Sequence, residues 1–271
     1  EAGNTIAGTV FAMSPQYIAS QLPTKYDVYV VSMNDGIFRC STGQDGVLQN
    51  CSDAHYPGTE TPFAIAVTKT KTIAYVAYSV GVAKCTINDN LTFGTCVSVG
   101  NGFTSPSGII LNNTESMAYI VNNNPNGGIS VCPIASNGTF ATCTKNTVGL
   151  PTSTLNFMTI NNAGTIAYIT DSRRNFVWIC TINGNGTLGT CTSDSTLVVT
   201  FIDAFGVTLD SIESKIYVTN FANSSTVATC SIESNNSIGN CSTYHLNGLS
   251  GSDYLTGITL NNTGSMAYIT D

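Results

Sequence analysis

Ten cysteines are the residues whose type and spacing bear most directly on chemistry. They bracket five segments of twelve residues each and none is left over: 40–51, 85–96, 132–143, 180–191 and 230–241. Thiols at this separation form disulfides or bind a metal ion. Structural zinc sites use closely spaced pairs such as Cys-x-x-Cys, which are missing from this sequence. The segments therefore predict five disulfides in an oxidising, extracellular or cell-surface location: Cys40–Cys51, Cys85–Cys96, Cys132–Cys143, Cys180–Cys191 and Cys230–Cys241.

Four acidic residues are the candidates for hydrolytic or metal chemistry. Glu60, Asp203 and Asp253 precede apolar, strand-like segments, and Asp171 follows one. Metal-assisted hydrolysis needs several carboxylates or amides around the metal, with a general base nearby. A fold that gathers the ends of these segments would gather the acids. Only Glu60 and Asp253 stand at approximately matching positions in their repeats. The simpler interpretation is that all four are solvated loop acids. We therefore predict no catalytic residue, no metal site and no cofactor.

Other catalytic patterns find little support. A serine nucleophile would need a Gly-x-Ser-x-Gly turn and a histidine base. The turn is missing, and the two histidines, His55 and His245, each stand beside a tyrosine. No Asp-x-Asp-x-Asp-Gly spacing indicates an EF-hand. Aromatic residues for a glycan-binding surface exist in predicted loops, but they are not in register between the repeats: Tyr56, Phe103, Phe176 and Phe221.

Nine Asn-x-Ser/Thr sites raise the prospect of N-glycosylation: Asn50, Asn90, Asn112, Asn137, Asn185, Asn223, Asn235, Asn240 and Asn261. Many would arise by chance in a chain so rich in Asn, Ser and Thr. Four of them recur five residues after the first cysteine of a segment: Asn90, Asn137, Asn185 and Asn235. Asparagine at such a position also suits a tight hairpin turn, because it tolerates a positive φ. Glycan attachment and turn formation are both open interpretations.

The elements that would position these residues are short strands. Period-two alternation and β-branched residues occur throughout, and no segment has helical periodicity. The first cysteines of successive segments are 45, 47, 48 and 50 residues apart. Each unit contains an alternating strand, a short turn, a tyrosine-bearing strand such as 167–171, and the cysteine-bracketed hairpin. Four strands in a unit of this length are typical of a β-propeller blade.

The blade arithmetic predicts six blades in a single domain, residues 1–271. Five full blades run from about 17 to 254, and residues 255–271 supply two strands of a sixth. The N-terminal arm, residues 1–16, contains the alternating stretch 5–13, which we expect to complete the last blade and cover an exposed edge. A five-bladed ring with surplus ends and a fragment of a longer chain are the alternatives.

The tyrosine-bearing strands resemble the YVTN family of β-propeller repeats. The resemblance rests on IYVTN at 216–220, AYITD at 167–171, AYIVN at 118–122 and GITLNNTGSMAY at 257–268, and it extends from about residue 17 to the end. It implies a propeller fold and a secreted or surface-layer protein, and the propeller relatives of the family include lactonases. A cysteine pair in every blade departs from the common pattern of the family and strengthens the extracellular interpretation.

The charge composition argues against nucleic acid as a partner. The net charge is −7 and only 9% of residues are charged, so the chain lacks the basic clusters that bind nucleic acid. No apolar run is long enough to span a membrane. We expect a secreted or cell-surface module without enzymatic activity, which binds an extracellular protein or glycan or self-associates into a filament or surface layer. The alternative is a lactonase-like hydrolase with a metal at the mouth of the central channel.

Overall fold

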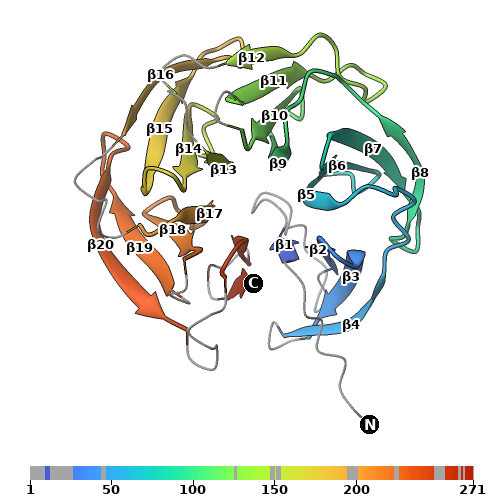
Figure 1. Cartoon of the computed structure of the whole chain (residues 1–271), viewed down its shortest axis with the longest axis horizontal. Coiled ribbons are helices and arrows are strands. Elements are labelled where there is room, and N and C mark those ends of the chain that lie inside the picture. The colour runs from blue at the N-terminus through green and yellow to red at the C-terminus, as the bar shows by residue number, and fades with distance from the viewer. Residues whose placement is uncertain are drawn as a thin grey trace.

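The structure is a computed structural model that describes residues 10–12, 27–43, 47–124, 127–146, 150, 154–193, 201–222, 226–246, 254–261, 264 and 266–270. Within this part of the chain every regular element is a strand. The strands form antiparallel sheets arranged around a ring, and within each blade the strands run in sequence order from the centre to the rim (Figure 1). The prediction of an all-β propeller is confirmed.

Five blades have four strands each. The first contains β1 (Val10–Ala12), β2 (Asp27–Ser32), β3 (Gly36–Thr42) and β4 (Leu48–Asp53). The second contains β5 (Pro62–Val67), β6 (Ile73–Tyr78), β7 (Gly81–Ile87) and β8 (Phe93–Ser98). The third contains β9 (Pro106–Leu111), β10 (Met117–Asn122), β11 (Ile129–Pro133) and β12 (Thr144–Asn146). The fourth contains β13 (Leu155–Ile160), β14 (Ile166–Asp171), β15 (Phe176–Ile182) and β16 (Leu188–Ser193). The fifth contains β17 (Ala204–Leu209), β18 (Lys215–Asn220), β19 (Thr226–Ile232) and β20 (Ile238–His245).

The predicted count of six blades is wrong. Beyond the five four-stranded blades, the described residues add only a two-stranded sheet of β21 (Ile258–Leu260) and β22 (Ala267–Ile269). The N-terminal strand does not fill that sheet. Val10–Ala12 pairs with β2 and is the innermost strand of the first blade. The segment 17–22, which we expected in that position, lies outside the described residues. An alternating apolar strand can add to either neighbouring blade, so its pattern alone does not choose its partner.

All five predicted disulfide pairings are present. Their setting is less uniform than the sequence suggests. The two cysteines face each other across paired strands in the second, fourth and fifth blades. In the first blade the register shifts between Arg39 and Ser41, on either side of Cys40, and in the third Cys143 precedes the short strand β12. In four blades the disulfide joins the two outer strands, and in the third it joins β11 to the residue before β12.

Tyrosines on the second strand of four blades connect each blade to the next. Each hydroxyl donates to a main-chain carbonyl in the outer hairpin turn of the following blade: Tyr29 to Leu91 (2.7 Å), Tyr75 to Gly138 (2.8 Å), Tyr119 to Gly186 (2.8 Å) and Tyr168 to Asn236 (3.1 Å). We call these four bonds the tyrosine latches. Burial raises the pKa of Tyr75, Tyr119 and Tyr168 to about 12. The latches explain why tyrosine recurs in this strand.

The pentapeptide AYITD occurs twice in the sequence, and its two copies show how much burial a complete blade provides. In β14 it is covered on both sides, and Ala167, Tyr168 and Ile169 are each at most 1% exposed. In β22 the only partner strand among the described residues is β21, and Ala267 is exposed. Burial here follows from the neighbouring strands, since the sequence is identical.

Candidate functional site

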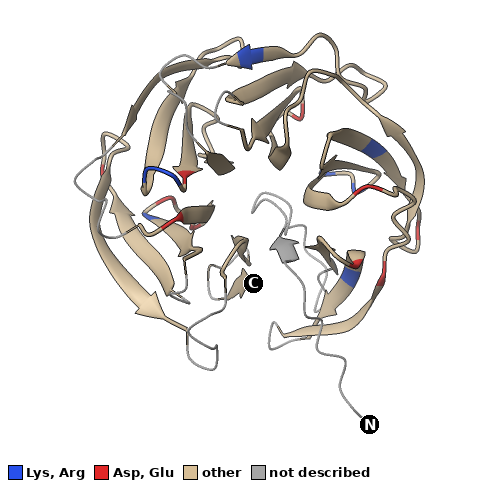
Figure 2. Cartoon of the chain, in the orientation of Figure 1, with Lys and Arg blue, Asp and Glu red and all other residues tan. Residues whose placement is uncertain are grey.

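The connection between β14 and β15 and the start of β17 place a charged cluster on one face of the ring. Because consecutive strands are antiparallel, the connection from the second to the third strand opens on the same face as the connection that leads into the next blade. We call this face the entry face, and the face that carries the outer hairpin turns the hairpin face. Figure 2 shows basic and acidic segments side by side where β14 passes into β15, close to the inner strands.

Asp171 is the buried anchor of the cluster. It is the last residue of β14 and is fully buried. Its Oδ2 accepts a hydrogen bond from Trp178 Nε1 at 3.0 Å, and its Oδ1 accepts one from the Arg174 amide at 3.2 Å. The Arg174 guanidinium lies 3.6 Å from Oδ2, and its side chain is 31% exposed. Asp171 therefore holds Arg174 at the surface and is itself closed to a ligand.

Asp203 is the more accessible acid. It lies directly before β17 with a φ of 57°, in the left-handed region that non-glycine residues rarely occupy. Its amide donates to Asn175 Oδ1 at 2.8 Å, and its carbonyl accepts from the Phe221 amide at 3.1 Å. Burial raises the pKa of the Asp203 carboxyl, and a hydrogen bond with Ser172 lowers it only in part. This half-buried carboxyl is the candidate general base, since burial shifts its pKa towards the working range of a base.

A row of aromatic rings borders the same cluster. Phe157 and Phe205 lie 5.6 Å apart between ring centroids, Phe205 and Phe221 5.0 Å, and Phe221 and Tyr254 4.9 Å. Tyr254 is 46% exposed, and so is Ile202, the residue before Asp203. The entry face thus presents apolar surface beside a carboxyl and a guanidinium, the combination that binds small organic molecules.

Polar side chains fix the inner strands beneath this surface. The buried Asn156 donates from Nδ2 to the carbonyl of Ala204 at 3.1 Å, in the next blade. Its own carbonyl accepts from Ser107 Oγ at 2.8 Å, from the blade before. These bonds hold the third, fourth and fifth blades in fixed relation, so the carboxyl and the guanidinium sit on a rigid base.

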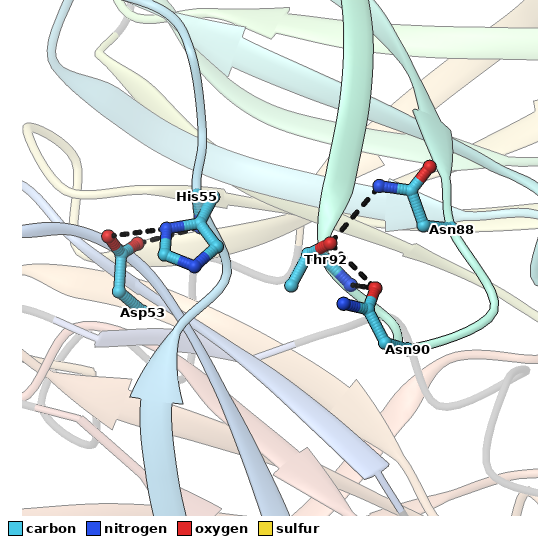
Figure 3. A network of polar contacts seen from close by, with 5 residues as sticks. All are labelled: Asp53, His55, Asn88, Asn90 and Thr92. Carbon is cyan, nitrogen blue, oxygen red and sulfur yellow. Dashed lines mark hydrogen bonds and ion pairs between the residues drawn. The ribbon is translucent and has the colours of Figure 1, made fainter.

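The other predicted site residues lie elsewhere. Glu60 accepts from Ser79 Oγ at 3.2 Å and belongs to the second blade. His55 contacts Asp53 on the surface, with Nδ1 3.2 Å from Oδ2 (Figure 3). His245 is the last residue of β20. Asp253 lies outside the described residues. Within the described part of the chain, no three His, Cys, Asp or Glu side chains gather where a metal ion would bind.

Two hollows open on the hairpin face, away from these charges. The larger, of about 450 Å³, lies between the third and fourth blades and is lined by residues that include Asn113, Tyr119 and Asn185. The second, of about 370 Å³, lies between the fourth and fifth blades beside Tyr168 and Glu213. Each surrounds a tyrosine latch. They are grooves between neighbouring blades that the repeat generates, and neither carries the charged cluster.

Sequence reasoning missed the neighbours of the cluster. Ser172 and Asn175, which bind Asp203, are small polar residues that no sequence pattern marked. Phe157 and Phe205 stood in predicted inner strands and were not considered as surface aromatics. A signal was available in the β14–β15 connection, since Asp171, Arg173 and Arg174 bring three charges together in a chain with very few.

Comparison with solved structures supports the fold. Periplasmic gluconolactonase from Pseudomonas aeruginosa superposes with a TM-score of 0.68 at 12% identity, over 91% of this chain and 76% of that one. A candidate 6-phosphogluconolactonase from Bacteroides uniformis gives 0.64 at 13% identity, over 90% and 75%. An auxiliary nutrient binding protein from Bacteroides ovatus gives 0.68 at 14% identity, over 97% and 66%. The chain is a β-propeller similar to lactonases and to a binding protein.

No family model matches the sequence. No curated protein matches it either. The resemblance to YVTN repeats therefore stays a prediction, and at these identities the solved structures show the fold alone. The described residues form no helix long and apolar enough to cross a membrane.

Proposed function

We propose that this chain is a propeller hydrolase that opens lactone rings at the entry face, with Asp203 as the general base. The observation that carries the proposal is the half-buried Asp203 carboxyl, whose pKa is raised by burial, beside the Arg174 connection and exposed apolar surface. The lactonases among the solved structures of similar fold support it. The expectation of a non-enzymatic module has its support in a different neighbour, the nutrient binding protein.

The chemistry uses side chains alone. A water molecule attacks the lactone carbonyl carbon, and Asp203 takes the proton that the water loses. The Arg174 guanidinium stabilises the negative charge that develops on the carbonyl oxygen. The bond between that carbon and the ring oxygen then breaks, and the ring oxygen leaves as an alcohol after it receives the proton from Asp203. The products are the hydroxy acid and an unchanged enzyme.

The role of Asp203 fixes the direction of the pH dependence. The base works only as a carboxylate, so the rate rises with pH as Asp203 loses its proton. Burial raises its pKa above the ordinary 3.8, so the rise is centred above that value. Asp171 acts as a positioning residue, because it holds Arg174 and does not reach the ligand.

A panel assay tests the proposal. The native, unreduced protein is mixed with five- and six-membered lactones, including glucono-δ-lactone and its 6-phosphate, and acid release is followed in a pH-stat. We expect at least one lactone to be opened faster than in buffer, and Asp203→Asn to remove that excess. No excess with any lactone, or an excess that survives in Asp203→Asn, would contradict the proposal.

A second candidate is a binding module without catalysis, and the aromatic row on the entry face favours it. An exposed aromatic ring such as Tyr254, at the end of this row, can pack against the apolar face of a sugar. The nutrient binding protein among the solved structures supports this function. Isothermal titration with the lactones and the corresponding sugars separates the two candidates, because a binding module takes up ligand and leaves it unchanged.

The location and self-association of the protein are part of the same proposal. Five disulfides and a periplasmic neighbour are consistent with an extracellular or periplasmic protein. With 9% charged residues, copies of the chain repel each other weakly, which favours a filament or surface layer. Negative-stain electron microscopy of the native protein tests this. Ordered fibres or sheets support assembly, and isolated discs at high concentration contradict it.

A further inference from the structure

The outer hairpin turns of the second to fifth blades have one common backbone geometry. In the first of them the Asn88 amide donates to the Thr92 carbonyl at 2.9 Å, and the Leu91 amide donates to the Asn88 carbonyl at 2.8 Å. The other three turns, 135–139, 183–187 and 233–237, repeat both bonds. The fourth residue of each turn has a positive φ: Leu91 63°, Gly138 76°, Gly186 82° and Asn236 66°.

The middle residue of every turn is the asparagine of an Asn-x-Ser/Thr site. Its Oδ1 accepts a hydrogen bond from the hydroxyl two residues later, at 2.7 Å in all four turns. Figure 3 shows this bond between Thr92 and Asn90. All four asparagines are exposed. Their Nδ2 atoms donate no hydrogen bond within the described residues, so each amide nitrogen faces solvent.

The remaining sites have a different setting. The Asn112 amide is engaged within its turn, since Nδ2 donates to Ser116 Oγ at 3.1 Å and Oδ1 accepts from the Ser116 and Met117 amides. Asn50 donates from Nδ2 to Ser41 Oγ at 3.3 Å. Asn240 lies inside β20, and the middle residue of its site is a disulfide cysteine. The sites at 223 and 261 fall wholly or partly outside the described residues.

We propose that Asn90, Asn137, Asn185 and Asn235 are N-glycan acceptors and that Asn50, Asn112 and Asn240 are not. The amide nitrogen attacks the anomeric carbon of a lipid-diphosphate-linked oligosaccharide. The bond from that carbon to the diphosphate oxygen breaks, the lipid diphosphate leaves with the electron pair, and the nitrogen loses one proton. An exposed turn with a free amide nitrogen admits the donor, whereas a paired strand or an engaged amide does not.

The tyrosine latches are compatible with this modification. Each latch binds the carbonyl of the residue after the asparagine, as Tyr29 does at Leu91, and leaves the asparagine side chain untouched. The four acceptors lie on the hairpin face, opposite Asp203. Glycans would therefore surround one face of the ring and leave the entry face open to ligands.

Site occupancy in a host with an oligosaccharyltransferase tests the proposal. The full chain is secreted from eukaryotic cells, treated with a peptide N-glycosidase in heavy-oxygen water, and mapped by mass spectrometry. We expect the asparagine-to-aspartate label at Asn90, Asn137, Asn185 and Asn235 and no label at Asn50, Asn112 or Asn240. Folded protein without label at the four turns, or with equal label at Asn112, would overturn the proposal.

A matched pair of variants identifies single sites. Thr92→Val removes the hydroxyl of one site and keeps the side-chain shape, so the secreted protein should lose the mass of one glycan. Thr70→Val removes an exposed hydroxyl outside any site, and its glycan mass should equal that of the unaltered chain. Circular dichroism confirms that both variants fold. An unchanged mass in folded Thr92→Val would show that Asn90 is not an acceptor.

Discussion

The two faces of the ring are built on different principles. On the hairpin face the same contacts recur blade after blade, and a tyrosine latch joins each of the first four blades to the next. On the entry face one main-chain bond also recurs, as from the Asn123 amide to the Ser105 carbonyl and from the Phe221 amide to the Asp203 carbonyl, but the side chains of the connections differ from blade to blade. Among the described residues, only the fourth and fifth blades combine a buried acid, a guanidinium and a half-buried carboxyl, through Asp171, Arg174 and Asp203. Contacts that repeat stabilise the fold, and contacts that occur once are the candidates for chemistry.

Among the predictions about the repeated contacts, the largest expected effect is a loss of protein stability at alkaline pH. The unfolded chain ionises its tyrosines near pH 10, but burial raises the pKa of Tyr75, Tyr119 and Tyr168 to about 12. Stability is therefore fully present below pH 10 and falls between pH 10 and 12, by about 2–3 kcal/mol for each tyrosine. Urea unfolding at several pH values measures this. A free energy of unfolding that stays constant up to pH 12 would contradict the burial of the latches.

The next largest effect is expected on the entry face, where loss of the Arg174 guanidinium should lower kcat/KM. Arg174→Gln removes the positive charge beside the reacting carbonyl, and kcat/KM for the lactone should fall by about 10²–10³. Arg173→Gln is the matched control, because Arg173 is the exposed neighbour in the same connection. Its kcat/KM should remain near that of the unaltered protein. Equal losses in both variants would show that the charge acts on the ligand only at long range.

Removal of one disulfide separates stability from activity. The double variant Cys180→Ser/Cys191→Ser opens a short loop in the outer hairpin of the fourth blade and should lose about 3 kcal/mol of stability. The entry face is built from inner strands, so kcat/KM in the folded protein should not change. Denaturant unfolding and lactone assays below the transition check both statements. A large activity loss in the fully folded variant would show that the outer hairpin influences the site on the entry face.

The smallest expected effect is the difference in stability between removing the hydroxyl of a tyrosine that forms a latch and removing that of the equivalent tyrosine that forms no latch. Tyr168→Phe removes the hydroxyl that binds the Asn236 carbonyl and should cost about 1 kcal/mol. Tyr217 stands at the same place in β18, is less buried, and donates no hydrogen bond from its hydroxyl within the described residues. Tyr217→Phe should therefore cost less than about 0.5 kcal/mol. Similar losses for both, measured by urea unfolding, would remove the distinction.

Sequence reasoning worked where the molecule repeats. The strand pattern, the hairpin turns and all five disulfide pairings follow from local alternation and from the spacing of the cysteines. The partner of each tyrosine could not be predicted, because Tyr168 reaches a carbonyl 68 residues away in another blade. The partner of the N-terminal strand was predicted wrongly for a similar reason. The pattern of residues 10–12 fits more than one sheet edge.

The candidate site was predictable only in part. Asp171 and Asp203 were chosen from their places beside strands, and in the structure Asp203 contacts Asn175 and Ser172 in the connection that Asp171 begins. Their roles differ because one is fully buried against Trp178 and the other is half-exposed, and burial of a loop acid depends on distant residues. Glu60 also precedes the first strand of a blade, as the sequence indicated, but that blade is the second, where Glu60 accepts a hydrogen bond from Ser79.

The central claim is that the single-copy cluster on the entry face performs chemistry. The most direct test measures kcat/KM for the best lactone in two variants, Asp203→Asn on the entry face and Asp210→Asn on the hairpin face. Asp210 binds Ser214 and Lys215 in a turn where asparagine occupies the equivalent place in other blades, so the second change preserves the fold. The account predicts a loss of about 10²–10⁴ for Asp203→Asn and little change for Asp210→Asn. Equal rates in the two variants would contradict it.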